Sequence, residues 1–285
     1  MKIRLPIAGV TLACTVAFAW WTTTLSQAPP PPLVRPYADC PHARVIDAAL
    51  GFLSRPEQQE RTGWQVYALL DYLQRRFRLD KRYSMEQVYP LEIWSEDDVK
   101  MAARFGRLVD PSFVIETSAL AKDADWLSNL MMRSLYCEIF PADDGFLEEM
   151  VERYEEDQAR PKPGYVTTHI ILCVLWLRER GCVDFNNPAL PTVSFADALE
   201  QIVSRERGET DLAFEAMMLL YYLGEGARVW DKWIETMAGL QRPSGAWGYD
   251  LSRPDDGHPT VLALWVLLEH ALPDASKCPW VRMEQ

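Results

Sequence analysis

The chain has 285 residues, of which 48% are hydrophobic and 11% aromatic, which is enough apolar material for a large domain with a buried core. Its formal net charge is -12 at pH 7. Because phosphate binding needs a dense cationic face, this charge balance excludes nucleic acid as an expected partner.

The N-terminal segment is typical of an exported protein. Lys2 and Arg4 precede an uncharged, mostly apolar stretch over residues 5–25, and basic residues before such a stretch favour a cytoplasmic N-terminus with the remainder outside. Two forms remain open. One is a signal peptide cleaved after the small-x-small sequence 17–19; the other is an uncleaved membrane anchor, because about 20 apolar residues can cross a bilayer. In either form we expect the domain to be periplasmic or on the extracytoplasmic face of the membrane. The expected organisation is a signal peptide or anchor over 1–28, a Pro-rich linker over 29–41 and a folded domain over 42–285.

After the linker, the chain is expected to be helical, because apolar residues recur at three- and four-residue steps and no useful alternating strand pattern occurs. Amphipathic helices are predicted over Ala43–Ser54, Ser95–Leu108, Gly145–Gln158, Ser194–Arg207 and Ala227–Leu240. Helices that are apolar nearly all round are predicted over Trp64–Leu73, Trp126–Ile139, Val166–Leu177, Leu212–Leu223 and Val261–Leu268. A helix without a polar face must be surrounded by protein, so the apolar set is expected to form an inner layer and the amphipathic set an outer layer. Asp125, Ser194 and Thr210 are expected to be N-caps.

The turn Gln241–Trp247 has the pattern Q-x-x-x-G-x-W and is followed by an apolar helix, and Gly63-Trp64 is a partial match to it. This pattern resembles the QW repeat of the terpenoid cyclase/prenyltransferase superfamily. The resemblance implies an α/α toroid, here of about five to six helical hairpins. The D-x-D-D acid of the squalene-type cyclases does not occur in the sequence, so the resemblance indicates an architecture rather than a reaction.

The apolar helices share a register that brings polar residues to one height. Near their C-terminal ends stand the aromatic residues Tyr72, Tyr136, Trp176, Tyr222 and Trp265, and seven residues before each stand Gln65, Asn129, His169, Glu215 and His258. In a ring of inner helices, equal register means equal height, so these five polar side chains are expected to converge on a central cavity. Buried polar groups cost roughly 1–3 kcal/mol each when unsatisfied. Mutual contacts, water or a ligand would explain such a layer.

His169, Glu215 and His258 are the candidate catalytic residues. Two histidines and a carboxylate could hold zinc or iron; alternatively, Glu215 could orient a histidine that acts as a general base. A purely structural role, in which each group bonds a neighbouring helix end, remains open, and no cofactor follows from the sequence. The candidate ligand-binding residues, which lie in this layer or in the loops leading to it, are Gln65, Asn129, Tyr165, Asp211, Tyr249 and Asp250.

The six cysteines are compatible with an oxidising compartment. Cys40 and Cys278 flank the folded region, and because domain ends are often close, a Cys40–Cys278 disulfide is one hypothesis. Cys173 stands within an apolar run, which favours a buried free thiol.

Three functions remain open from the sequence. The favoured one is an exported or membrane-anchored toroid domain that binds a small molecule, a glycan or an envelope protein without catalysis. The second is a hydrolase or lyase, polysaccharide-directed or metal-dependent, that uses His169, Glu215 and His258. The third is a helical-repeat scaffold.

Overall fold

The computed structural model describes residues 35–55, 58, 64–80, 105–115, 125–184 and 192–282. All of these residues belong to one compact unit, Val34–Gln285. The described residues form helices and no strand; the β-type pairing found among them is an isolated bridge between Trp247 and Asp256. The predicted all-α class is therefore confirmed.

The helices follow the predicted alternation closely. The outer, amphipathic set comprises α1 (Ala43–Leu53), α7 (Asp144–Gln158), α9 (Thr192–Glu206) and α11 (Asp231–Gly239). The apolar set comprises α3 (Trp64–Phe77), α6 (Trp126–Leu135), α8 (Tyr165–Glu179), α10 (Asp211–Leu223) and α12 (Gly257–Ala271). Short 3-10 turns stand at η3 (Gly106–Leu108) and η5 (Gly226–Arg228). Most of the helix predicted over Ser95–Leu108 lies outside the described residues.

Side-chain caps begin several of these helices. Asp125 accepts a hydrogen bond from the Ser128 N–H, and Thr210 accepts one from the Ala213 N–H, so both predicted N-caps are confirmed. The prediction for Ser194 is wrong, because α9 begins two residues earlier at Thr192 and Ser194 lies inside the helix.

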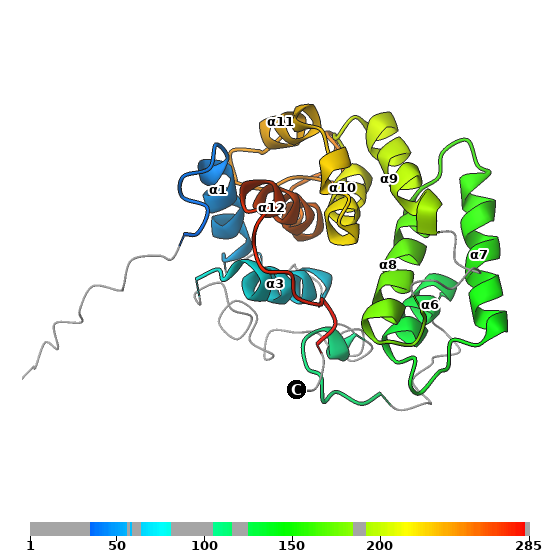
Figure 1. Ribbon diagram of the computed structural model, residues 1–285. Coiled ribbons are helices and arrows are strands. Elements are labelled where there is room, and N and C mark those ends of the chain that lie inside the picture. Colours follow the sequence, from blue (N-terminus) through cyan, green and yellow to red (C-terminus); the bar gives the residue numbers. More distant parts are fainter. Residues whose placement is uncertain are drawn as a thin grey trace, which may run out of the picture. The chain divides into compact units, whose positions relative to one another are not determined.

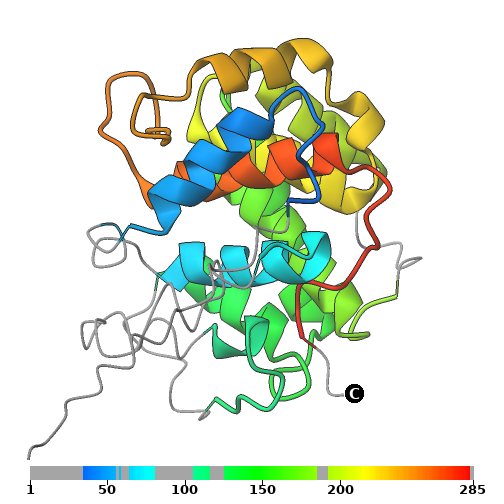
Figure 2. The ribbon, with the colours of Figure 1, turned by 90° about the vertical axis from the view of Figure 1, so that its left-hand side faces the viewer.

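The apolar helices contact one another in the order α3, α12, α10, α8 and α6. The amphipathic helices pack outside this series: α1 and α11 contact α12, α9 contacts α10, and α7 contacts α8 (Figures 1 and 2). The burial supports the two predicted layers, because nearly every residue of α8, α10 and α12 is buried, whereas α7 buries one face. The inner series supplies the walls of the candidate site.

The turn Gln241–Trp247 joins the outer helix α11 to the segment that precedes α12. The Gln241 side-chain amide donates hydrogen bonds to the carbonyls of Val45 in α1 (2.8 Å) and Gly245 (3.0 Å). The buried indole N–H of Trp247 donates to the Met237 carbonyl in α11 (2.8 Å). Glycine is required at 245, since its φ is +92° and a Cβ would lie 2.2 Å from the Ala48 carbonyl oxygen. The turn thus fastens α11 to α1.

The disulfide hypothesis is corrected by the structure. Cys137 pairs with Cys182, while Cys40 and Cys278 are free thiols. The bond joins the ends of α6 and α8, two helices that pack side by side, so their ends meet although they are far apart in sequence. Cys173 is free and fully buried, as predicted, and burial raises the pKa of its thiol to about 12.

Among the described residues, no helix is long and apolar enough to span a membrane. The predicted leader or anchor over 1–28 lies outside the described residues.

Candidate functional site

A cavity of about 260 Å³ lies between the inner helices. Its walls include Ala68 and Leu69 of α3, Leu127, Ser128 and Met131 of α6, His169, Leu172 and Trp176 of α8, Glu215 and Met218 of α10, and His258 and Leu262 of α12. Phe105, Leu108, Asp125 and Trp280 complete the lining. The volume is just below the range of about 300–1,000 Å³ that is usual for small-molecule sites.

The inner faces of three helices present the same sequence of layers. On each helix, a polar residue is followed one turn later by an aliphatic or Met residue and after two turns by an aromatic residue. The three sets are His169, Leu172 and Trp176 on α8; Glu215, Met218 and Tyr222 on α10; and His258, Leu262 and Trp265 on α12. Helical rise separates the polar and aromatic layers by about 10 Å. His169 contacts Glu215 near the start of α8 and α10, and Tyr222 contacts Glu179 near their ends; His258 contacts Asp211 near the start of α12 and α10, and the Tyr222 and Trp265 rings lie 5.8 Å apart near their ends. The three helices α8, α10 and α12 therefore run parallel.

His169 and Glu215 form the first pair of the polar layer. The His169 Nδ1 lies 3.2 Å from Glu215 Oε1 and 2.8 Å from the Tyr165 carbonyl oxygen. Both oxygens accept, so Nδ1 carries the proton. The other ring nitrogen, Nε2, has no partner among the described residues and is the atom free to bind or accept a proton.

Asp211 and His258 form the second pair. Asp211 is fully buried at the first position of α10, and its carboxylate accepts hydrogen bonds from His258 Nδ1 (3.0 Å) and from the Tyr165 hydroxyl (2.9 Å). The ring of Tyr249 stacks on His258, with centroids 6.1 Å apart, and the Tyr249 carbonyl accepts the Asp211 N–H. This arrangement fixes the orientation of His258 and leaves its Nε2 without a partner in the described part of the chain.

Burial and neighbouring charges shift the pKa of Glu215, His258 and Tyr165. Burial raises the pKa of Glu215, and the charge of His169 opposes that rise. For His258, burial disfavours the imidazolium, but the hydrogen bond and charge of Asp211 outweigh it, so the pKa of His258 is raised above its usual value. Burial, and then the charge of Asp211, also raise the pKa of Tyr165, which therefore remains a donor.

Three buried polar atoms on the cavity walls lack a hydrogen-bond partner within the described residues. They are Glu215 Oε2 and the indole nitrogens of Trp176 and Trp280. Other tryptophans have partners: the Trp265 N–H donates to Glu269 (3.1 Å) and the Trp247 N–H to Met237 (2.8 Å). Unsatisfied buried groups cost about 1–3 kcal/mol each, and their concentration on one cavity favours a bound partner there.

The other predicted site residues lie away from the cavity lining or cannot be placed. Asn129 lies on α6 beside the lining residue Ser128 but is not part of the wall. Asp250 is not part of the lining, and its carboxylate accepts from the Ser252 N–H and hydroxyl in a local turn (2.7 and 2.6 Å). The side chain of Gln65 lies outside the described part. The functional roles of the residues that do meet stay predictions.

Trp280 was missed by the sequence reasoning. It lies beyond the last helix, where periodicity gives no signal, and yet it is buried and lines the cavity. The preceding residues, Cys278 and Pro279, indicate that the segment is not helical but do not indicate that Trp280 is buried.

The described residues contain no group of three or more His, Cys, Asp or Glu side chains arranged to hold a metal ion. His169 and His258 point their Nδ1 atoms at separate carboxylates, Glu215 and Asp211. The arrangement is therefore two oriented His–carboxylate pairs around one cavity. Comparisons of the chain with models of protein families, with curated proteins and with solved structures found no match.

Proposed function

We propose that this domain binds a small, mainly apolar molecule that carries a hydroxyl or similar polar group. The observation that carries the proposal is Glu215 Oε2, a buried acceptor on the cavity wall that has no hydrogen-bond partner among the described residues. The indole N–H groups of Trp176 and Trp280 also lack a partner there, but they lie about two helical turns away and could meet only a second polar group of the molecule. The aliphatic and Met side chains that line the cavity between the polar and aromatic layers would contact the apolar part of the bound molecule.

The proposal predicts that Glu215 serves ligand binding rather than stability. We expect Glu215→Met to change the free energy of unfolding by less than about 1 kcal/mol, because the loss of the Oε1 contact with His169 is offset by removal of the unpartnered Oε2, and His169 Nδ1 keeps the Tyr165 carbonyl as its acceptor. The same change should weaken the binding of 1-hexanol about tenfold, the equivalent of one lost hydrogen bond. Calorimetric titration and urea unfolding measure the two effects, and Glu148→Gln on the exposed face of α7 is the control. A loss of stability with undiminished hexanol binding would assign Glu215 a structural role.

A second candidate function is acid–base catalysis by a hydrolase or lyase. The observation that favours it is that both cavity histidines are held through Nδ1 by acceptors while their Nε2 atoms have no partner among the residues that the structure describes, which is how an oriented general base is arranged. Release of new reducing ends from a panel of polysaccharides by the purified protein, abolished in His258→Asn, would support it. Equal release by that variant would exclude His258 as the base.

We further propose that the fold is an α/α toroid related in architecture to the terpenoid cyclase/prenyltransferase superfamily. The series of inner helices and the Gln241–Trp247 turn support this proposal, as does the lining of one cavity by both α3 and α6, the two ends of the series. Spin-label distances between α3 and α6 test it: a closed ring requires a shorter distance than between α3 and α9.

Export to an oxidising compartment is also proposed. The basic residues before the apolar stretch and the Cys137–Cys182 disulfide support it, since disulfides are rare in reducing compartments. Mass spectrometry after thiol blocking of cell extracts tests it, and a reduced Cys137 and Cys182 in those extracts would contradict it.

A further inference from the structure

Trp176 and Trp280 line the cavity, and Trp280 packs among the aromatic rings that stand two turns beyond the polar layer. The ring centroid of Trp280 lies 5.1 Å from that of Trp265, 5.5 Å from Trp176 and 6.0 Å from Tyr222. Tyr72 of α3 lies 5.8 Å away on the remaining side. Four inner helices therefore surround one side chain that none of them supplies.

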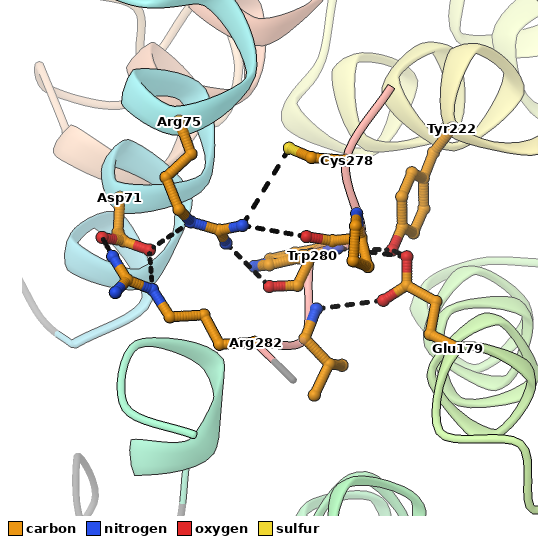
Figure 3. Close-up of polar contacts among 9 residues, drawn as sticks. Asp71, Arg75, Glu179, Tyr222, Cys278, Trp280 and Arg282 are labelled. Atoms are coloured by element: carbon orange, nitrogen blue, oxygen red, sulfur yellow. Dashed lines mark hydrogen bonds and ion pairs between the residues drawn. The ribbon is translucent and has the colours of Figure 1, made fainter. Parts of the chain in front are cut away.

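That side chain belongs to residues 278–282, which we call the C-terminal strap. The Arg75 guanidinium donates to the carbonyls of Pro279 (2.9 Å) and Trp280 (2.8 Å). The Glu179 carboxylate accepts the N–H groups of Trp280 (3.1 Å) and Val281 (3.0 Å). Figure 3 shows the strap lying between these two side chains.

Further contacts hold the strap at its far end. Arg282 donates to Asp71 of α3 at 2.6 Å, and the hydroxyl of Tyr222 bonds Glu179 and accepts the Trp280 N–H (3.3 Å). Burial raises the pKa of Glu179, and hydrogen bonds from Tyr222 and the strap N–H groups oppose that rise. Arg75, Glu179 and Tyr222 bind backbone atoms of the strap, so they fix its position and with it the Trp280 ring.

We propose that Trp280 is a specificity-determining residue of the cavity: it is the end wall that limits the length of the bound molecule, and the strap completes the site by positioning it. This inference rests on the proposed binding function. A molecule whose hydroxyl bonds Glu215 would extend past Met218 and Leu172 and meet Trp280 about two helical turns away. Removal of the indole therefore lengthens the space available to an apolar chain.

The test titrates the full-length protein with primary alcohols from 1-butanol to 1-decanol by calorimetry. In the wild type we expect affinity to rise about fourfold for each methylene until the chain reaches Trp280, and then to fall. In Trp280→Ala the rise should continue to longer alcohols, and Trp280→Phe should give an intermediate limit. Trp230→Ala, which removes an exposed tryptophan (56% exposed), should keep the wild-type limit.

Indole provides a second measurement. It should bind Trp280→Ala, because it fills the space that the substitution leaves, and restore the wild-type length limit. The same length limit in wild type and in both Trp280 variants would overturn this inference alone. Absence of alcohol binding to the wild type at every length would overturn the proposed function and this inference with it. If Trp280→Ala fails to fold, Trp280→Phe decides the question.

Discussion

The substitution Asp211→Asn should lower both the pKa of His258 and the stability of the domain. Asp211 is fully buried and accepts two hydrogen bonds, from His258 and from the Tyr165 hydroxyl. Asparagine keeps the shape but removes the charge, and hydrogen bonds to a charged group contribute about 1.5–3 kcal/mol each, against about 0.5–1.5 for neutral ones. With two bonds weakened, we expect a loss of about 2–3 kcal/mol in the free energy of unfolding.

The pH dependence gives the sign of the effect. The folded-state pKa of His258 is raised, so the native state binds this proton more tightly than the unfolded chain does. Its contribution to stability is fully present below the unfolded pKa of about 6.5 and is lost as pH rises through the folded pKa. Because Asp211 is the largest cause that raises this pKa, Asp211→Asn should flatten the fall in stability on the alkaline side of pH 6.5.

Nuclear magnetic resonance titration of the imidazole carbons measures the pKa directly, and the chain has only four histidines to assign. Urea unfolding at pH 6 and pH 8 measures the stability. Asp110→Asn is the matched control, because that exposed carboxylate accepts from the Ser112 N–H and hydroxyl in a local turn and is not among the charges that shift the pKa of His258. An unchanged His258 pKa in Asp211→Asn would refute the assignment of Asp211 as its stabilising partner.

Three further changes test the scaffold by urea unfolding. Gly245→Ala should cost at least about 2 kcal/mol, because φ is +92° and the new Cβ would meet the α1 backbone; wild-type stability would show that the turn can relax. Glu269→Gln should cost about 3–5 kcal/mol, since it leaves Arg76 buried without its bidentate partner at 2.6 and 2.7 Å; a change under about 1 kcal/mol would show that Arg76 finds another acceptor. Replacing Cys137 and Cys182 by serine should lower the free energy of unfolding by about 4 kcal/mol, the chain-entropy value for a separation of 45 residues. Equal stability of the oxidised wild type and the double variant would contradict this expectation.

The sequence alone sufficed for the helices and their common register. Periodicity locates apolar helices because a helix buried on all sides must be apolar on all sides, and α8, α10 and α12 follow that pattern nearly end to end. The spacing of seven residues between His169 and Trp176, repeated from Glu215 to Tyr222, then places like residues at like height. The sequence could not show that Asp250 accepts hydrogen bonds in a local turn, because aspartate is common both in turns and in binding sites.

Cysteine pairing and the choice of partner for each histidine could not be obtained in this way. Inner helices that follow one another along the chain, such as α6 and α8, are neighbours in space. Helix periodicity does not specify which side chains meet beyond the helix ends, and Cys137 and Cys182 both lie just past the ends of their helices. The hypothesis that the two ends of the domain lie close together predicted a Cys40–Cys278 disulfide, but both residues are free thiols.

The parallel direction of the inner helices explains why the two ends of the cavity differ. The N-terminal ends of α8, α10 and α12 meet at the polar layer, and the partial positive charge of helix N-termini stabilises carboxylates such as Asp211. The opposite ends present carbonyl groups and partial negative charge, and there Arg75 and Arg76 stand in the last turn of α3. Arginines in that position can also bind carbonyls of another segment, as Arg75 does with the strap. The strap therefore lies at the end where helix polarity favours arginine, which leaves the carboxylate end of the cavity for the polar group of a ligand.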